Sequence, residues 1–179
     1  MAEIVSVSRR TDIPAFHPGW FSSALDAGKA TYRAPYTGKH ATVSLARDDV
    51  AAFVFWSRNP APFLPVLLRL EAAGYPSIFH FTITGLPRRL EPSVPDTAES
   101  VRSFRALSRI VGPDRALWRF DPILPGETPR RLLARFDALS ASLSGLTRRC
   151  TVSLAHPYRK SVRATRDDPG IWVRRDALR

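Results

Sequence analysis

Charged and hydroxyl side chains gather at the points where several predicted strands of the chain end. They are Arg9, Arg10, Thr11 and Asp12, then Arg58 and Asn59, Thr82 and Thr84, Arg119 and Asp121, and finally Tyr158, Arg159 and Lys160. Guanidinium groups that converge on one place suit a carboxylate or a phosphate, because each can donate parallel charge-assisted hydrogen bonds. We therefore expect these residues to bind a small anionic ligand.

Proton transfer at such a site would need a group that titrates near neutral pH. His80 is the best candidate for a general acid or base, because imidazole titrates in that range. Asp12 and Asp121 are the candidate catalytic carboxylates, and His156 is the next histidine to consider.

Each of these residues also has a purely structural interpretation. Arg119 and Asp121 could simply pair with each other. They could also join Arg10 and Asp12 in a structural network. Asn59 could be a helix N-cap, and Asp12 could be only a turn residue.

Several common kinds of site are excluded by the residue inventory. Cys150 is the only cysteine, which excludes an internal disulfide, a four-cysteine zinc site and a self-contained iron–sulfur cluster. The four histidines are scattered, and there is no Gly-rich phosphate loop and no G-x-S-x-G motif. We expect no metal site and no cofactor in this chain, and Cys150 should be an inert core thiol.

The chain carries 27 Lys and Arg against 16 Asp and Glu, a net charge of +11. Such a balance suggests an anionic partner, of which nucleic acid is one kind. Only Lys29, Lys39 and Lys160 are lysines, however, and the arginine bias, with 16 prolines, is what GC-rich coding would give. Nucleic acid is therefore a candidate partner that the composition does not favour over a small anion.

Apolar runs of strand length alternate with longer segments of helical period, the pattern of β/α units. The predicted core strands are residues 4–8, 50–57, 77–84, 116–121 and 150–155. The predicted helices lie within residues 18–28, 60–74, 96–112 and 128–145, and a hairpin joins residues 31–34 to 41–45 around Thr37-Gly38. Asp96 and Glu99 have the spacing of a capping box.

Read at period two, the predicted strands are apolar on one face and polar on the other. Phe79, Phe81 and Trp118 belong to the apolar face, whereas His80 and Arg119 belong to the polar one. Parallel strands that are covered by helices on both sides are usually apolar throughout. The polar face therefore predicts a barrel interior or a cavity, with any active site at the carboxyl ends of the strands.

The fold class that follows is α/β, with a mostly parallel sheet that resembles a partial or open TIM barrel. Five core strands cannot close an eight-stranded barrel, so we expect an open edge after residues 150–155 and a chain that is truncated relative to a full barrel. Such an edge should make the chain self-associate or leave it marginally stable. We expect one β/α domain over residues 1–160 and a poorly structured basic tail over residues 161–179.

The chain offers no membrane-targeting signal. The longest apolar run, residues 50–56, is far shorter than a membrane span, and the first ten residues lack the apolar core of a signal peptide. We expect a cytoplasmic protein without membrane contacts.

Five separated motifs resemble a bacterial family called domain of unknown function 1848. They are SRRTDIPAF at 8–16, VFWSRNP at 54–60, FTITG at 81–85, WRFDPI at 118–123 and YRK at 158–160. The resemblance covers about residues 3–160. It implies a β/α barrel-like fold and, in longer relatives, a C-terminal cysteine cluster similar to that of radical S-adenosylmethionine enzymes, with an iron–sulfur cluster and S-adenosylmethionine. Residues 162–179 do not look like the family's continuation.

Two hypotheses of different class follow. In the first, the chain is the N-terminal part of a radical-enzyme-like barrel, with an arginine-rich anion site, no cluster ligands and no activity expected from the chain alone. In the second, it is a cluster-free module that binds phosphate or nucleic acid through the same arginines.

Overall fold

The computed structural model describes residues 1–34, 36–156 and 171–172. Its strands are β1 (Glu3–Ser6), β2 (Lys29–Arg33), β3 (His40–Ser44), β4 (Val50–Ser57), β5 (Ser77–Thr82), β6 (Ala116–Ile123) and β7 (Cys150–Leu154). Its helices are α1 (Ile13–Phe16), α2 (Pro18–Asp26), α3 (Leu64–Ala72), α4 (Thr97–Val111) and α5 (Pro129–Ser142), with short 3-10 turns at Arg47–Asp49 and Ala61–Phe63.

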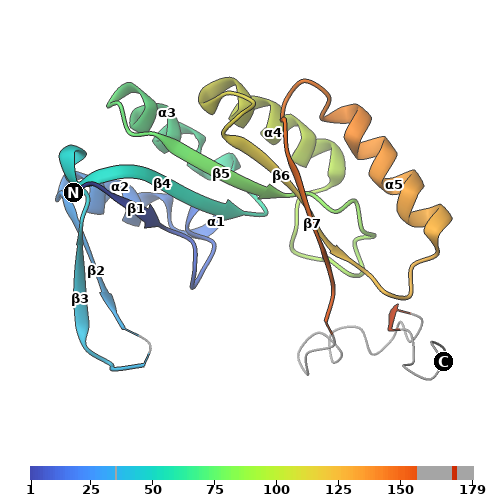
Figure 1. Cartoon of the computed structure of the whole chain (residues 1–179), viewed down its shortest axis with the longest axis horizontal. Helices are drawn as coiled ribbons and strands as arrows, with labels where there is room; N and C mark the ends of the chain where they lie inside the picture. The colour runs from blue at the N-terminus through green and yellow to red at the C-terminus, as the bar shows by residue number, and fades with distance from the viewer. Residues whose placement is uncertain (35, 157–170, 173–179) are drawn as a thin grey trace.

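Five strands form one parallel sheet in the order β1-β4-β5-β6-β7. The sheet curls into a half-barrel, with α3, α4 and α5 along its convex side (Figure 1). The predicted open, parallel α/β fold is confirmed. The predicted hairpin is also present as the antiparallel pair β2 and β3, and it extends away from the main sheet (Figure 1).

Local sequence signals account for most helix boundaries. The Asp96 carboxylate accepts a hydrogen bond from the Glu99 backbone N–H at 2.7 Å, so α4 begins at the predicted capping box. It ends at Gly112, whose φ of +82° favours glycine. At α5 the N-cap is Thr128, but its side chain makes no capping hydrogen bond.

The core is an aromatic layer between the sheet and its helices. Phe55, Phe79, Phe81 and Phe120 are buried, and the rings of Phe55 and Phe79, from neighbouring strands, stack with centroids 5.5 Å apart. Trp118, on the same face of β6, is buried as well. Their alternation confirms the predicted apolar face and leaves the residues between them on the concave face of the sheet.

β7 departs from the sequence expectation. All five of its residues are exposed, including Cys150, so the prediction of a buried core thiol was wrong. The reason is topological: β7 pairs with β6 only and is the last strand of the sheet within the described residues. Val152, on the face that β6 buries, is 53% exposed.

The end of the chain is described only in part. Of the predicted tail, the structure describes Ile171 and Trp172, and the other residues of 161–179 lie outside the described residues. Ile171 is buried, and its carbonyl accepts a hydrogen bond from the Gly126 N–H at 2.7 Å. Among the described helices, none is long and apolar enough to cross a membrane.

We predict that the exposed edge of β7 mediates self-association, and that Val152→Lys weakens it. A lysine on an edge strand opposes pairing with a second strand, because its charge would have to leave water. Sedimentation equilibrium should give the wild-type chain a concentration-dependent mass above 20.0 kDa and the variant a smaller one.

The matched control is Leu133→Lys, at an equally apolar position on α5 that is 58% exposed. It should leave the wild-type behaviour unchanged. A wild-type chain that sediments as a monomer at every concentration would contradict the prediction.

Candidate functional site

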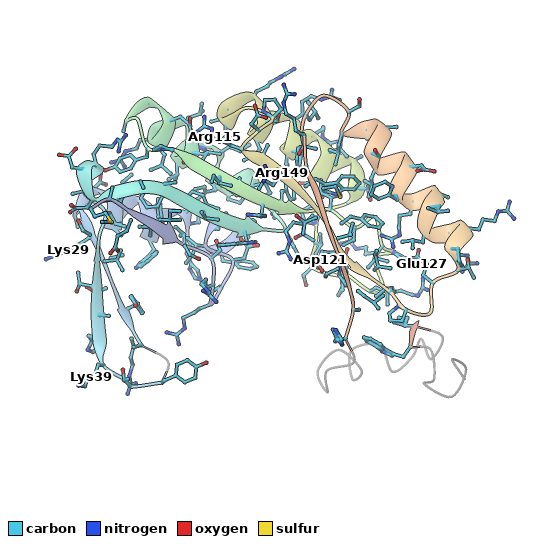
Figure 2. All side chains as sticks on the ribbon, in the orientation of Figure 1. Lys29, Lys39, Arg115, Asp121, Glu127 and Arg149 are labelled. Carbon is cyan, nitrogen blue, oxygen red and sulfur yellow. The ribbon has the colours of Figure 1, made fainter. Side chains whose placement is uncertain are left out.

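The carboxyl ends of the parallel strands meet at one rim of the half-barrel, and three carboxylates organise it. They belong to Asp12, in the loop after β1, to Glu91, in the loop after β5, and to Asp121, in β6. Each accepts hydrogen bonds from residues of at least one other strand or loop. Figure 2 shows Asp121 at this rim, with Glu127 on the side toward α5.

Asp12 ties the β1 loop to the end of β4. One carboxylate oxygen accepts a hydrogen bond from the Ala15 N–H at 2.9 Å and so caps α1. The other accepts from the Ser57 hydroxyl at 3.0 Å and from the Arg58 N–H at 2.9 Å. With three donors on one carboxylate, Asp12 acts as a positioning residue for the backbone that carries Arg58.

Arg58 and Glu91 form the central ion pair of the rim. The Arg58 guanidinium contacts the Glu91 carboxylate through Nη1 and lies 3.4 Å from the Asp121 carbonyl oxygen through Nη2. The second oxygen of Glu91 accepts from the hydroxyl of the buried Thr84. Glu91 is only 13% exposed and Arg58 38%, so solvent reaches the cation more readily than its partner.

Asp121 is the centre of a second group of interacting polar side chains at the rim. It pairs with Arg119, two residues before it on the same strand face, and it accepts a hydrogen bond from the Ser153 hydroxyl on β7. The structure thus brings Arg119 and Asp121 together as an ion pair, as the structural interpretation proposes. It joins them to β7 and, through the Asp121 carbonyl, to Arg58.

Sequence reasoning missed the most buried ion pair near the rim. Arg135 of α5 pairs with Glu127, and their side chains are 11% and 14% exposed. The Arg135 guanidinium also lies 4.4 Å from the Phe120 ring centroid and donates to the Thr84 carbonyl. Because neither charged residue lies on a strand, reading the strands at period two could not find them.

The remaining predicted residues lie in different surroundings. Arg9 and Thr11 are exposed, and Arg10 donates to the Arg33 carbonyl of the hairpin at 2.6 Å, away from the central ion pair. The Asn59 side chain accepts from the Ala61 N–H at 3.3 Å in an Asx turn, and the N-cap position of the following 3-10 turn is Pro60.

Three predicted residues have no described position. Tyr158, Arg159 and Lys160 lie outside the described residues. Their assignment to the site therefore stays a prediction.

His80 lies on the concave face of β5, on the same side of the strand as Thr82, which pairs with Arg119 of β6. Its ring stacks on Trp56 of the neighbouring strand, with centroids 5.1 Å apart and planes 10° from parallel. Its Nδ1 is buried and finds no hydrogen-bond partner among the described residues. Burial, together with the positive charge of Arg119, lowers the pKa of His80 below its usual 6.5, so the neutral ring predominates at pH 7.

A groove of about 830 Å³ opens at the same rim. Arg58, Glu91 and Asp121 contribute its charged lining, and Ser153 and His156 add polar groups. Most other lining residues are apolar, among them Leu90, Leu154 and Ile171. Such a volume with a few polar groups among apolar walls is typical of small-molecule sites.

The residues present do not fit an iron–sulfur cluster. Cys150 is the single thiol of the chain and stands on the outer strand β7, not at the rim. Within the described part of the chain, no three His, Cys, Asp or Glu side chains group as metal ligands would.

We predict that acidification from pH 7 to pH 5 destabilises the chain partly through His80. Its lowered folded pKa means that the unfolded chain takes up this proton first, so the contribution of His80 to stability is present above about pH 6.5 and is lost as the pH falls. Urea unfolding at both pH values should show a smaller loss for His80→Gln than for wild type. An NMR titration placing the His80 pKa at or above 6.5 would refute this.

A family model matches most of the chain. No curated protein and no solved structure matches the chain. Residues 4–176 match the family described as Domain of unknown function (DUF1848), so the likeness continues well past residue 160, where the sequence resemblance was expected to end, and the expectation for residues 162–179 was wrong. The match spans nearly the whole sequence and agrees with the motifs at the rim, and the chain therefore belongs to this family.

Proposed function

We propose that the chain binds a small anionic ligand with an apolar body in the groove at the carboxyl ends of β4 to β7. The observation that carries this proposal is the position of Arg58. Its guanidinium is 38% exposed, lines the groove of about 830 Å³, and is held by Glu91 and by the Asp121 carbonyl.

The hydrogen bonds of Arg58 leave room for a ligand. A guanidinium has five N–H donors in a planar fork, and contacts to Glu91 and the Asp121 carbonyl use only part of this capacity. A carboxylate or phosphate at the groove could take the remaining donors as charge-assisted hydrogen bonds. The cost is competition with Glu91, because both anions would draw on one cation.

The apolar walls supply the second part of the proposed recognition. Leu86, Leu90 and Leu124 line the groove around its charged end. Burial of an apolar ligand body against them contributes roughly 25 cal/mol for each Å² removed from water. The ligand class that fits is therefore an organic carboxylate or phosphate, in preference to an inorganic ion.

His80 and Asp121 are the proposed acid–base groups: Asp121 lines the groove, and His80 stands on Trp56 on the concave face, outside the groove lining. The lowered pKa of His80 makes it a base at neutral pH, and Arg119 lies near enough to lower that pKa. Asp121 is held in place by the Arg119 guanidinium and the Ser153 hydroxyl. Asp12 is assigned a positioning role, since its carboxylate is occupied by three protein donors.

Of the radical-enzyme hypothesis, this proposal keeps only the barrel-like fold. A parallel half-barrel with a polar concave face supports a barrel-enzyme ancestry. The cluster ligands are not in this chain, because it has one cysteine. We assign it the ligand-binding rim, and no step of radical chemistry.

We predict opposite effects from the two partners of the central ion pair. Arg58→Gln removes the cation and should weaken binding of phenyl phosphate by about tenfold to a hundredfold, the equivalent of about 1.5–3 kcal/mol for hydrogen bonds to a charged group. Glu91→Gln removes the competing anion and should strengthen it. Isothermal titration calorimetry measures both, with phenol as a neutral probe of similar shape.

The control is Arg105→Gln on α4, an exposed arginine that does not line the groove, which removes the same charge. It should leave the affinity unchanged. Equal affinities for phenyl phosphate and phenol, or losses of the same size in Arg58→Gln and Arg105→Gln, would reject the site.

A separate prediction concerns cofactor content. After anaerobic reconstitution with iron and sulfide, the monomeric chain should retain neither in stoichiometric amount, because one thiolate cannot supply the ligands of a cluster. Metal analysis and an absorption spectrum of the desalted protein test this. A stable chromophore with stoichiometric iron would show that residues other than Cys150 can supply the ligands of a cluster.

A further inference from the structure

The β2–β3 hairpin has one face made entirely of polar side chains. Direct cross-strand pairs share a face, and the pairs on this face are Lys29 with Ser44, Thr31 with Thr42, and Arg33 with His40. All six residues are exposed. The opposite face carries Ala30 and Val43, which pack against the core, so the polar face is the one turned to solvent.

The hairpin strands and turn carry positive charge only, and an acidic group meets the polar face at its base, where the Asp49 carboxylate accepts from the Ser44 hydroxyl at 2.6 Å. No Asp or Glu occurs between Ala27 and Ala46. Lys29 stands at the base of the hairpin and Lys39 near its tip, as Figure 2 shows. Within the described part of the chain, neither lysine is in an ion pair, in contrast to the rim arginines 58, 119 and 135.

Two arginines add charge to the same surface and are held in place. Arg33 donates from Nε to the Gly38 carbonyl at 3.0 Å, which fixes its guanidinium over the turn. Arg10 donates to the Arg33 carbonyl at 2.6 Å and so brings the β1 loop against the hairpin. Both bonds go to neutral carbonyl oxygens, so the charges of these arginines remain available to a partner.

We propose that the β2–β3 hairpin is a nucleic-acid-binding arm that contacts the phosphates of a duplex through Lys29, Arg33 and Lys39. Lysine, arginine and hydroxyl side chains are the groups that contact phosphate and sugar in protein–nucleic acid complexes. A two-stranded ribbon is also narrow enough for the major groove, which is about 12 Å wide. Tyr36, beside the turn, is 99% exposed and adds an aromatic surface at the tip.

Charge complementarity favours a polyanion over a protein partner. The exposed face has no apolar residue among its six positions, so it could not form the dry centre of a protein interface. Its cations are of one sign and spread from the base of the hairpin to its tip. The surface does not include the groove lining, so this inference does not depend on the proposed small-molecule site.

The test is the salt dependence of binding to a fluorescein-labelled 20-bp duplex, measured by fluorescence anisotropy. The test variant combines Lys29→Gln, Arg33→Gln and Lys39→Gln. The control combines Arg102→Gln, Arg105→Gln and Arg109→Gln, three exposed residues of α4. Both variants lose three charges, so net charge is matched and only the position differs.

Each phosphate contact contributes about 0.9 to the slope of log affinity against log salt for a duplex. Loss of three contacts should flatten the slope by about 2.7. Between 50 and 200 mM salt, the affinity of the wild type and of the control should then fall about 40-fold more than that of the hairpin variant. Lys29→Arg with Lys39→Arg keeps the charge and should bind as the wild type does.

Three outcomes would overturn the proposal. They are no binding of the duplex by wild type at 50 mM salt, slopes that change equally in the two triple variants, and binding to anionic lipid vesicles but not to the duplex. Circular dichroism and thermal melts of all variants accompany the titrations. A hairpin variant that melts with the wild type and loses the steep slope supports the proposal.

Discussion

The aromatic layer between the sheet and its helices determines which side chains project from the concave face of the sheet. Phe55, Phe79 and Phe120 occupy alternate positions of their strands and are buried against the helices. The residues between them must then project to the other face, because side chains alternate along a strand. Trp56, His80 and Arg119 stand on the concave side for this reason, with Trp56 beside His80 and Arg119 beside Thr82 in neighbouring strands.

The carboxylates at that rim are paired with side chains of the protein. Glu91 and Asp121 each receive a guanidinium and a hydroxyl from different elements. This pairing locks the loop after β5 to the ends of β4 and β6. It also means that an incoming anion must compete with a carboxylate already present, which would favour ligands that offer two acceptor oxygens or an apolar body.

The sequence predicted structure best where the structure depends on a pattern of neighbouring residues. The strand of residues 50–57 and the capped start of α4 were predicted correctly, because a continuous apolar run and a capping box are local patterns. Glu91 was missed because its partner Arg58 is 33 residues away. Arg135 was missed because its contact with the Thr84 carbonyl spans 51 residues, and its ion-pair partner Glu127, 8 residues before it, does not lie on a strand. The exposure of Cys150 was missed because its strand contains Val152 and Leu154 and was interpreted as part of the core, although an open edge after residues 150–155 was itself expected from the strand count.

The central claim is that an organic anion binds in the rim groove at Arg58. The most direct measurement is an NMR titration of isotope-labelled chain with phenyl phosphate, following the backbone amides and the Arg58 guanidinium. The account predicts saturable shifts at Arg58 and at groove residues such as Leu90 and Leu154. Shifts confined to Lys29 and Lys39 of the hairpin, or none that saturate, would contradict it.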